Sequence, residues 1–311
     1  MRIVIAGGTG FVGSPLAEVY AEEGHDVRVL TRSLADGEAR HDPGTGMPGI
    51  TRVGWRPDGQ PGLWAQVADG ADAVVNLAGE SLGNRRWTPQ RKAQLRDSRI
   101  LATRSIAAAL SAAATPPLVL VSSSAVGYYG PAGAEPKTED SPAGTDFLSR
   151  LAEEWEAEAR KAEPSSARVV LLRTGLVLER VGGALPRMVR PFRFFVGGPL
   201  GSGRQYVSWI HRLDLIEMIR WIIDTPGVSG PVNATAPHPV TNREFARALG
   251  RAIRRPSLVP APAFALRLLV GEMADPLLLT GQRVLPGVAQ AHGYHFRYPE
   301  IDIAMRGIFG E

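Results

Sequence analysis

The chain has 311 residues, no cysteine and a formal net charge of +4 at pH 7. This length suffices for one large α/β domain with a smaller lobe. The lack of cysteine excludes disulfides, thiolate metal sites and a cysteine nucleophile, and it is typical of a reducing cytoplasm, where we expect the protein. The charge is mild and its arginines are dispersed, so the composition predicts no nucleic-acid partner.

The first element is a short apolar run from Ile3 to Ala6, which predicts a buried parallel strand. It leads into glycines at 7, 10 and 13 and then into a helical pattern from Leu16 to Glu23. In such a unit the first glycine permits the tight turn, the second admits a pyrophosphate, and the third lets the helix approach the sheet. The helix N-terminus adds free N–H groups. The unit therefore predicts dinucleotide binding.

The second strand, Asp26 to Leu30, is followed by Thr31-Arg32-Ser33. An NAD site usually has an acidic residue here to hold the ribose 2′-hydroxyl. Arg32 can instead bind a 2′-phosphate in bidentate fashion, and Ser33 can donate a hydrogen bond. The alternative is a solvated arginine at a strand end. The sequence favours NADP(H) over NAD(H).

The rest of the chain alternates apolar strands with helical patterns, which predicts an α/β fold with a doubly wound, Rossmann-type parallel sheet. We expect an NADP-binding domain over 1–180, with segments of about 205–235 returning to it. Substrate-side loops and a mostly helical lobe then occupy 181–311. The late apolar segment 259–280 is interrupted by charges and prolines, and no secretory signal is recognised at the start, so we expect no membrane partner. The expected later elements are strands near 50–55, 73–77, 118–122, 168–172 and 232–235, and helices over 89–113, 146–162, from 241 and within 260–285.

Ligands of parallel α/β sheets bind outside the carboxyl ends of the strands. Three such ends beyond the glycine loop carry small or hydroxyl residues, at 76–79, 122–130 and 174–178. The residues expected to bind the cofactor are Gly7, Thr9, Gly10, Phe11, Val12, Gly13, Thr31, Arg32, Ser33, Leu77, Ala78, Gly79, Glu80, Arg99, Ser122, Ser123, Gly175 and Leu176.

Together with these strand ends, five further strings resemble the extended short-chain dehydrogenase/reductases, and among them one atypical group. This is the epimerase-family proteins of family 39U, typified by bacterial YfcH, which carry a C-terminal domain of unknown function. The resemblance covers essentially the whole chain, and it implies an NADP(H)-binding protein whose substrate is undefined. The strings are 79–88, 96–103, 197–205, 208–211 and 279–286.

The resemblance also defines what is missing from the catalytic apparatus. The superfamily uses a serine or threonine after the fifth strand to polarise a substrate oxygen, and Ser124 occupies that place. It then uses Tyr-x-x-x-Lys on the next helix to move a proton. Here that helix holds no tyrosine, Phe147 and Leu151 stand near the expected positions, and Arg150 is the nearby cation in register. Tyr128 could replace the missing acid, although a tyrosine packed on its loop is the commoner arrangement.

Three residues are candidates for substrate binding. Arg283 lies where extended family members often hold a substrate phosphate, and Arg204 could join it. His211 can titrate near neutral pH, but related epimerases use the equivalent stretch largely for structure. These residues predict a small, anionic substrate, and we expect no metal.

Two functions stay open. The first is an NADP(H)-dependent oxidoreductase or epimerase-like enzyme, favoured by Ser124 and the polar substrate-side loops. The second is a non-catalytic NADP(H)-binding module that senses redox state and acts through a protein partner, favoured by loss of the tyrosine and lysine. Sugar epimerisation of the usual kind needs the missing pair. The chain is expected to be a monomer or a homodimer. Superfamily members often dimerise through the helices after the fourth and fifth strands, but here these helices bear many charged residues, which suit an exposed face equally well.

Overall fold

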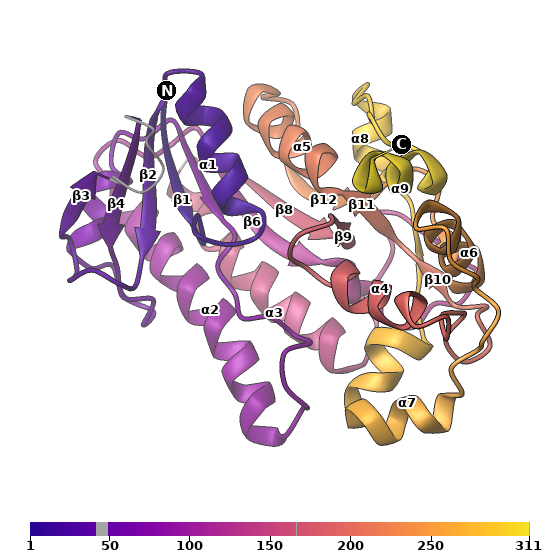
Figure 1. Cartoon of the computed structure of the whole chain (residues 1–311). Coiled ribbons are helices and arrows are strands. Elements are labelled where there is room, and N and C mark those ends of the chain that lie inside the picture. The colour runs from indigo at the N-terminus through magenta and orange to yellow at the C-terminus, as the bar shows by residue number, and fades with distance from the viewer. Residues whose placement is uncertain (42–48, 166, 311) are drawn as a thin grey trace.

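A computed structural model describes residues 1–41, 49–165 and 167–310. Its centre is an eight-stranded sheet in the order β12-β8-β6-β5-β1-β2-β4-β3 (Figure 1). Neighbouring strands run parallel except β3, which pairs antiparallel with β4. This confirms the predicted α/β, doubly wound Rossmann-type fold. The strands are β1 (Arg2–Ala6), β2 (Asp26–Thr31), β3 (Ala39–His41), β4 (Ile50–Gly54), β5 (Ala73–Asn76), β6 (Val119–Ala125), β8 (Arg168–Thr174) and β12 (Gly230–Ala234).

Helices cover both faces of this sheet. Because side chains alternate along a strand, Ile3 and Ile5 of β1 pack on one face, with residues of α1 and α5. Val4 and Ala6 pack on the other, with residues of α2 and α3, and Figure 1 shows the two layers. The helices are α1 (Gly13–Glu22), α2 (Pro89–Ala112), α3 (Phe147–Arg160) and α5 (Arg212–Asp224).

The order of the strands fixes where a ligand can bind. β1 lies between β2 and β5, so the strands that follow β1 in the sequence lie on both sides of it in the sheet. At such a reversal the connections leave in opposite directions, and a crevice opens at the carboxyl ends of the strands. The glycine loop, which follows β1, lies at this point.

The later part of the chain forms a smaller layer of helices and two-stranded sheets. Phe245 and Leu249 of α6 pack against Met305 and Ile308 of α9 in a separate core. The elements are β7 (Pro136–Lys137) with β14 (Arg283–Val284), β9 (Leu176–Leu178) with β11 (Trp209–His211), β10 (Tyr206–Val207) with β13 (Val240–Thr241), and the helices α4 (Leu185–Arg193), α6 (Asn242–Ala252), α7 (Ala263–Val270), α8 (Gly287–Ala291) and α9 (Ile301–Phe309). Short helical turns cover 63–67, 126–129, 163–165, 271–273 and 275–279.

Most expected elements are confirmed within two or three residues, including the helix that begins after Thr241 with its capping box. The elements that were not foreseen include β3, in a glycine- and proline-rich region, α5, which follows β11 directly, and the two-stranded sheets and last two helices of the smaller layer. Part of that region, 42–48, lies outside the described residues. The division of the chain near residue 180 stays a prediction. Across the described ranges, no helix is both long and apolar enough to cross a membrane.

Candidate functional site

The glycine loop packs closely against the end of β5. Gly7 has φ +77°, and a Cβ there would lie 2.7 Å from the carbonyl carbon and oxygen of Leu77, so only glycine fits. A Cβ at Gly13 would lie 2.3 Å from the carbonyl oxygen of Gly7, which explains how α1 begins so close to the loop. α1 has no side-chain cap and no acidic residue in its first turn. Among its first four residues, Ser14 and Leu16 already donate their N–H groups to the preceding turn and Pro15 has no N–H, whereas the N–H of Gly13 has no backbone partner within the described residues and can donate to an anion.

Gly10 leaves room above the loop, because a Cβ there would meet only the carbonyl oxygen of Gly7, at 3.1 Å. The next residue, Phe11, lies against a second segment of backbone. A Cβ at Gly182 or Gly183 would approach its ring to 2.6 and 2.9 Å, and the guanidinium carbon of Arg212 lies 5.3 Å from the ring centre. The loop is therefore flanked by segment 182–183 while the space over Gly10 stays open, a shape that fits a pyrophosphate.

The end of β2 presents the side chains expected to distinguish NADP from NAD. Thr31 is buried, and its hydroxyl lies 2.9 Å from that of Ser33. Arg32 and Ser33 are exposed. Within the described ranges, the guanidinium of Arg32 forms no hydrogen bond or ion pair. An exposed cation without an internal partner suits a phosphate ligand, although its role stays a prediction.

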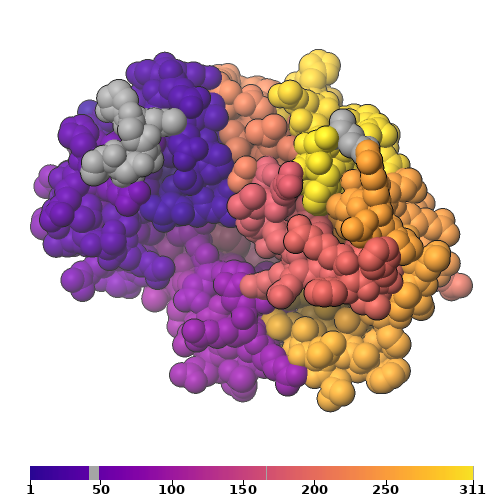
Figure 2. Space-filling model, viewed as in Figure 1, coloured from indigo at the N-terminus to yellow at the C-terminus, as the bar shows by residue number. Residues whose placement is uncertain are grey.

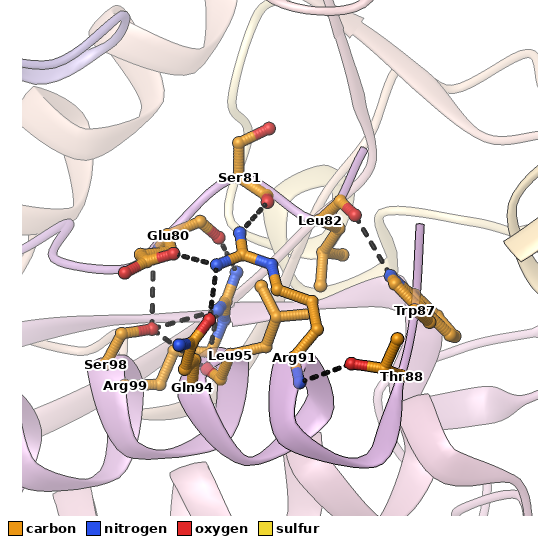
Figure 3. Close-up of polar contacts among 10 residues, drawn as sticks. All are labelled: Glu80, Ser81, Leu82, Trp87, Thr88, Arg91, Gln94, Leu95, Ser98 and Arg99. Atoms are coloured by element: carbon orange, nitrogen blue, oxygen red, sulfur yellow. Dashed lines mark hydrogen bonds and ion pairs between the residues drawn. The ribbon is translucent and has the colours of Figure 1, made fainter. Parts of the chain in front are cut away.

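Two buried arginines hold the loop that follows β5 (Figure 3). Arg91 of α2 forms an ion pair with Glu80 and donates to the carbonyl oxygen of Ser81 at 3.0 Å. Arg99, about two turns further along, donates to the carbonyl oxygens of Glu80 at 2.7 Å and Leu95 at 2.8 Å. Burial lowers the pKa of Arg99 to about 10, so it stays charged at neutral pH. Arg99 thus positions backbone next to Gly79.

The three serines of β6 have different surroundings. Ser122 is completely buried, with the side-chain nitrogen of Asn76 at 3.5 Å, whereas Ser123 is half-buried. Ser124 donates its hydroxyl to Glu156 Oε1 at 2.7 Å. That carboxylate is ion-paired and can only accept, so the proton of Ser124 is committed to it. Ser124 can therefore accept a hydrogen bond from a ligand but cannot donate one while this contact lasts.

Behind Ser124 lies a buried ion pair that the sequence did not suggest. Arg173 Nε donates to Glu156 Oε1 at 2.8 Å and Arg173 Nη2 to Oε2 at 2.9 Å, and both side chains are almost fully buried. Arg173 also donates to the Tyr129 hydroxyl at 3.0 Å, which in turn donates to Asn233 Oδ1 at 2.7 Å. Burial raises the pKa of Tyr129 to about 12, so its proton stays on. One available signal was Arg173 itself, which directly follows the apolar run Val169–Leu172 of β8.

Tyr128 follows β6, and Phe147 begins α3, the helix on which the usual tyrosine was expected. The guanidinium carbon of Arg173 lies 3.5 Å from the ring centre of Tyr128, a cation–π contact that orients the half-buried ring. Phe147 packs edge-on against Trp87, with ring centres 5.2 Å apart, inside an apolar cluster with Leu148 and Met273. The Phe147 side chain at the start of α3 therefore packs in an apolar environment. The catalytic roles of Ser124 and Tyr128 stay predictions.

At the end of β8, the sixth expected strand, the backbone at Gly175 passes very close to the backbone at Ser208. A Cβ at Gly175 would lie 2.6 Å from the carbonyl oxygen of Ser208, and the N–H of Leu176 donates to the same oxygen at 2.8 Å. Both residues lie at the carboxyl end of β8, beside that of β6. The structure thus brings the expected cofactor residues together at neighbouring strand ends.

The predicted substrate residues fall into two environments. Arg204 is exposed and Arg283 half-buried, and they come from adjoining segments, because Gly281 packs on Tyr206 and Gln205 donates to the carbonyl oxygen of Leu278 at 2.7 Å. Arg283 Nε is buried without a hydrogen-bond partner among the described residues. An arginine with unused donors can bind an anionic group. This pair keeps its predicted role.

His211 lies inside the protein. It is 3% exposed, its Nδ1 accepts the N–H of Leu213 at 3.1 Å as the N-cap of α5, and its ring stacks on Tyr298 with centres 3.9 Å apart. These contacts are structural and leave little surface for a ligand. The predicted substrate contact therefore finds no support in its surroundings.

Acid conditions are expected to destabilise the protein through this histidine. Burial lowers the pKa of His211 from 6.5 to about 4. Between those values the unfolded chain binds a proton here that the folded chain does not. Its contribution, roughly 3 kcal/mol for a pKa change of this size, is complete above pH 6.5 and is lost as the pH falls toward 4. Urea denaturation of His211→Asn, which keeps an N-cap acceptor but does not titrate, should show a flatter pH dependence in this window. Equal slopes for both proteins would contradict a lowered pKa.

Two family profiles match the sequence. That of the NAD dependent epimerase/dehydratase family matches residues 3–234, and that of a domain of unknown function, DUF1731, matches residues 261–308. The epimerase family protein SDR39U1 homolog, chloroplastic, of Arabidopsis thaliana is 41% identical over 310 residues, covering 99% of this chain and 86% of that protein. Human epimerase family protein SDR39U1 is 37% identical over 311 residues, covering 99% of each.

Solved structures of similar proteins share the fold of this chain. The crystal structure of human epimerase family protein SDR39U1 (isoform 2) with NADPH matches with a TM-score of 0.86 and 35% identity, covering 99% of both chains. That of a nucleoside-diphosphate sugar epimerase from Corynebacterium glutamicum matches with a TM-score of 0.77 and 30% identity, covering 100% of this chain and 58% of that one. The similarity thus extends beyond the nucleotide-binding half.

Proposed function

Because this chain belongs to the NAD dependent epimerase/dehydratase family, we propose that it is an NADP(H)-dependent oxidoreductase or epimerase-like enzyme acting on a small anionic metabolite. Its expected resemblance to family 39U is confirmed by the relatives. The observation that carries the choice of cofactor is the exposed Arg32, without an internal partner in the described residues, beside Ser33 at the end of β2. NADPH in the human relative's structure supports the same choice.

The chain's own groups bind the cofactor in three places in this proposal. The loop around Gly10 and the N–H of Gly13 at the start of α1 hold the pyrophosphate. Arg32 and Ser33 hold the 2′-phosphate. The backbone of 77–80, fixed by Arg99, lines the crevice beside Gly7. When bound, the cofactor gives or takes a hydride.

The proton must then come from a group other than the usual tyrosine. Ser124 accepts a hydrogen bond from the substrate, since its own proton is held by Glu156. Tyr128, oriented by Arg173, is the proton donor or acceptor in this proposal. Arg204 and Arg283 hold the anionic end of the substrate. The buried, unpartnered Nε of Arg283 supports that assignment.

Replacing Arg32 by alanine is expected to weaken NADPH binding about 10- to 100-fold and to leave NADH binding unchanged. The reason is that hydrogen bonds to a charged phosphate contribute about 1.5–3 kcal/mol. Titration of both cofactors, followed by their fluorescence, measures this directly. Arg306→Ala removes an exposed arginine on α9 and serves as the matched control. Equal affinity of the wild-type protein for NADPH and NADH would overturn the NADP assignment.

A second function keeps support from two observations. Ser124 donates to Glu156, and α3 carries no Tyr-x-x-x-Lys pair, so the chain could bind NADP(H) as a redox-sensing module that acts through a protein partner. Incubating the NADPH-loaded protein with a panel of anionic carbonyl compounds separates the two. Oxidation of NADPH that is lost in Tyr128→Phe supports the enzyme. NADPH that stays reduced with every compound favours the sensor.

A further inference from the structure

Apart from Arg267, helix α7 consists of apolar residues, yet it buries none of its residues. Phe264, Leu268 and Leu269 are 74, 76 and 68% exposed. The helix is nevertheless well anchored at its C-terminal end, where Arg86 donates to the carbonyl oxygens of Leu268 at 2.6 Å and Leu269 at 2.7 Å. An ordered helix that leaves its large apolar side chains in water needs a partner surface to account for its sequence.

Two neighbouring segments extend this apolar surface. Phe194, Phe195 and Val196 follow α4, and Leu258 and Val259 lie beside them, because the N–H of Val259 donates to the carbonyl oxygen of Gly197 at 3.1 Å. Figure 2 shows the end of α4 and the orange α7 on one face of the molecule. We call this surface the α7 face: Phe194, Phe195, Val196, Leu258, Val259, Phe264, Leu268 and Leu269.

The α7 face is large for a protein that stays alone. Its eight side chains expose on the order of 1,000 Å² of apolar surface, given that an aromatic side chain presents about 150–250 Å². The largest apolar patch of a typical monomer is about 300–600 Å², and a stable protein interface buries about 800 Å² on each partner. The other large apolar side chains that are exposed in the described residues lie elsewhere: Met1, Leu63, Leu118, Val181, Leu213 and Ile303.

We propose that two copies of this chain form a homodimer through the α7 face. The area of the face matches what such an interface needs. At its end beyond α7, Glu272 is paired with Lys92 and Asp275 with Arg267, so the acidic charges there are balanced within the chain and do not oppose the approach of a second copy. A twofold axis through the middle of the face would set the exposed side chains of α7 in one copy against those around Phe195 in the other.

The helices α2 and α3 offer a less suitable surface. Their exposed side carries ion pairs between Arg96 and Glu154 and between Arg104 and Glu158. Such a face is well solvated and has little apolar area to bury. The proposed interface is also independent of the proposed function, since it includes none of the residues assigned to cofactor or substrate.

Analytical ultracentrifugation of the full chain over a range of micromolar concentrations tests the proposal. The wild-type protein is expected to sediment as a dimer and the double variant Phe264→Asp/Leu268→Asp as a monomer. Because both side chains are exposed, the variant should fold, which its circular dichroism and NADPH binding will show. Leu118→Asp alters a residue that is 74% exposed at the far end of β6 and should leave the dimer intact.

Three results would overturn the proposal. The wild-type protein could sediment as a monomer at every concentration. The double variant could stay dimeric, which would place the interface elsewhere. A monomeric wild-type protein could instead cosediment with vesicles of anionic phospholipid and lose this binding in the double variant, which would assign the face to a membrane. NADPH binding, measured in parallel, reports separately on the proposed function.

Discussion

Replacement of Arg173 by methionine is expected to lower the free energy of unfolding by about 3–5 kcal/mol. The side chain is 2% exposed and is held by both oxygens of Glu156, by Tyr129 and by the carbonyl oxygen of Glu139. Methionine fills a similar volume, so the change removes mainly charge and hydrogen bonds. It leaves the carboxylate of Glu156 buried with only the hydroxyl of Ser124 as donor. An uncompensated buried charge of this kind is far more costly than a lost surface contact.

Urea denaturation of Arg173→Met and of a matched control gives the measurement. Arg104 also pairs with a glutamate of α3, Glu158, but its side chain is 41% exposed, so Arg104→Met should cost under about 1 kcal/mol. The double variant Arg173→Met/Glu156→Met should recover most of the loss, since it leaves no buried charge. A loss of equal size in the two single variants, or no recovery in the double variant, would contradict a destabilisation caused by the stranded carboxylate.

The strands that carry the cofactor site could be predicted because each leaves a local pattern in the sequence. A parallel strand covered on both faces is a short continuous apolar run, as in β1 and β5. Positions 7 and 13 must be glycine because a Cβ there would collide with neighbouring backbone. The same close approach recurs wherever a strand of this kind turns tightly into a helix. The order of these elements therefore revealed the fold and the crevice.

The network behind Ser124 could not be predicted in the same way. It joins Ser124, Glu156, Arg173 and Asn233, which lie on four different elements and have no common spacing. A glutamate within a charged helix such as α3 is usually exposed to solvent. Glu156 is buried beside Ser124 and Arg173 because α3 packs on β6 and β8. The exposure of α7 was missed for a similar reason. Its apolar sequence predicts a buried helix, and local pattern cannot tell whether its own chain supplies the cover.

Substitution of Gly10 by valine is expected to lower the affinity for NADPH at least about 100-fold while leaving the fold intact, an effect of about 2.7 kcal/mol on binding. The backbone at Gly10 is not in the left-handed region, and a Cβ there would meet only the carbonyl oxygen of Gly7, at 3.1 Å. The branched side chain must then occupy the open space over the loop. In the proposed function that space belongs to the pyrophosphate.

Gly227→Val is the matched control. A Cβ at Gly227 meets nothing within 4 Å, and Gly227 precedes β12, away from the carboxyl ends of the strands. Both variants should unfold near the wild-type urea concentration, and only Gly10→Val should lose NADPH. Undiminished binding in Gly10→Val would mean that the phosphates do not lie on the glycine loop, and the proposed oxidoreductase would lose its cofactor site. A binding loss accompanied by unfolding would instead assign Gly10 to the fold. The comparison of binding with stability therefore decides whether this glycine makes room for a ligand or for the chain itself.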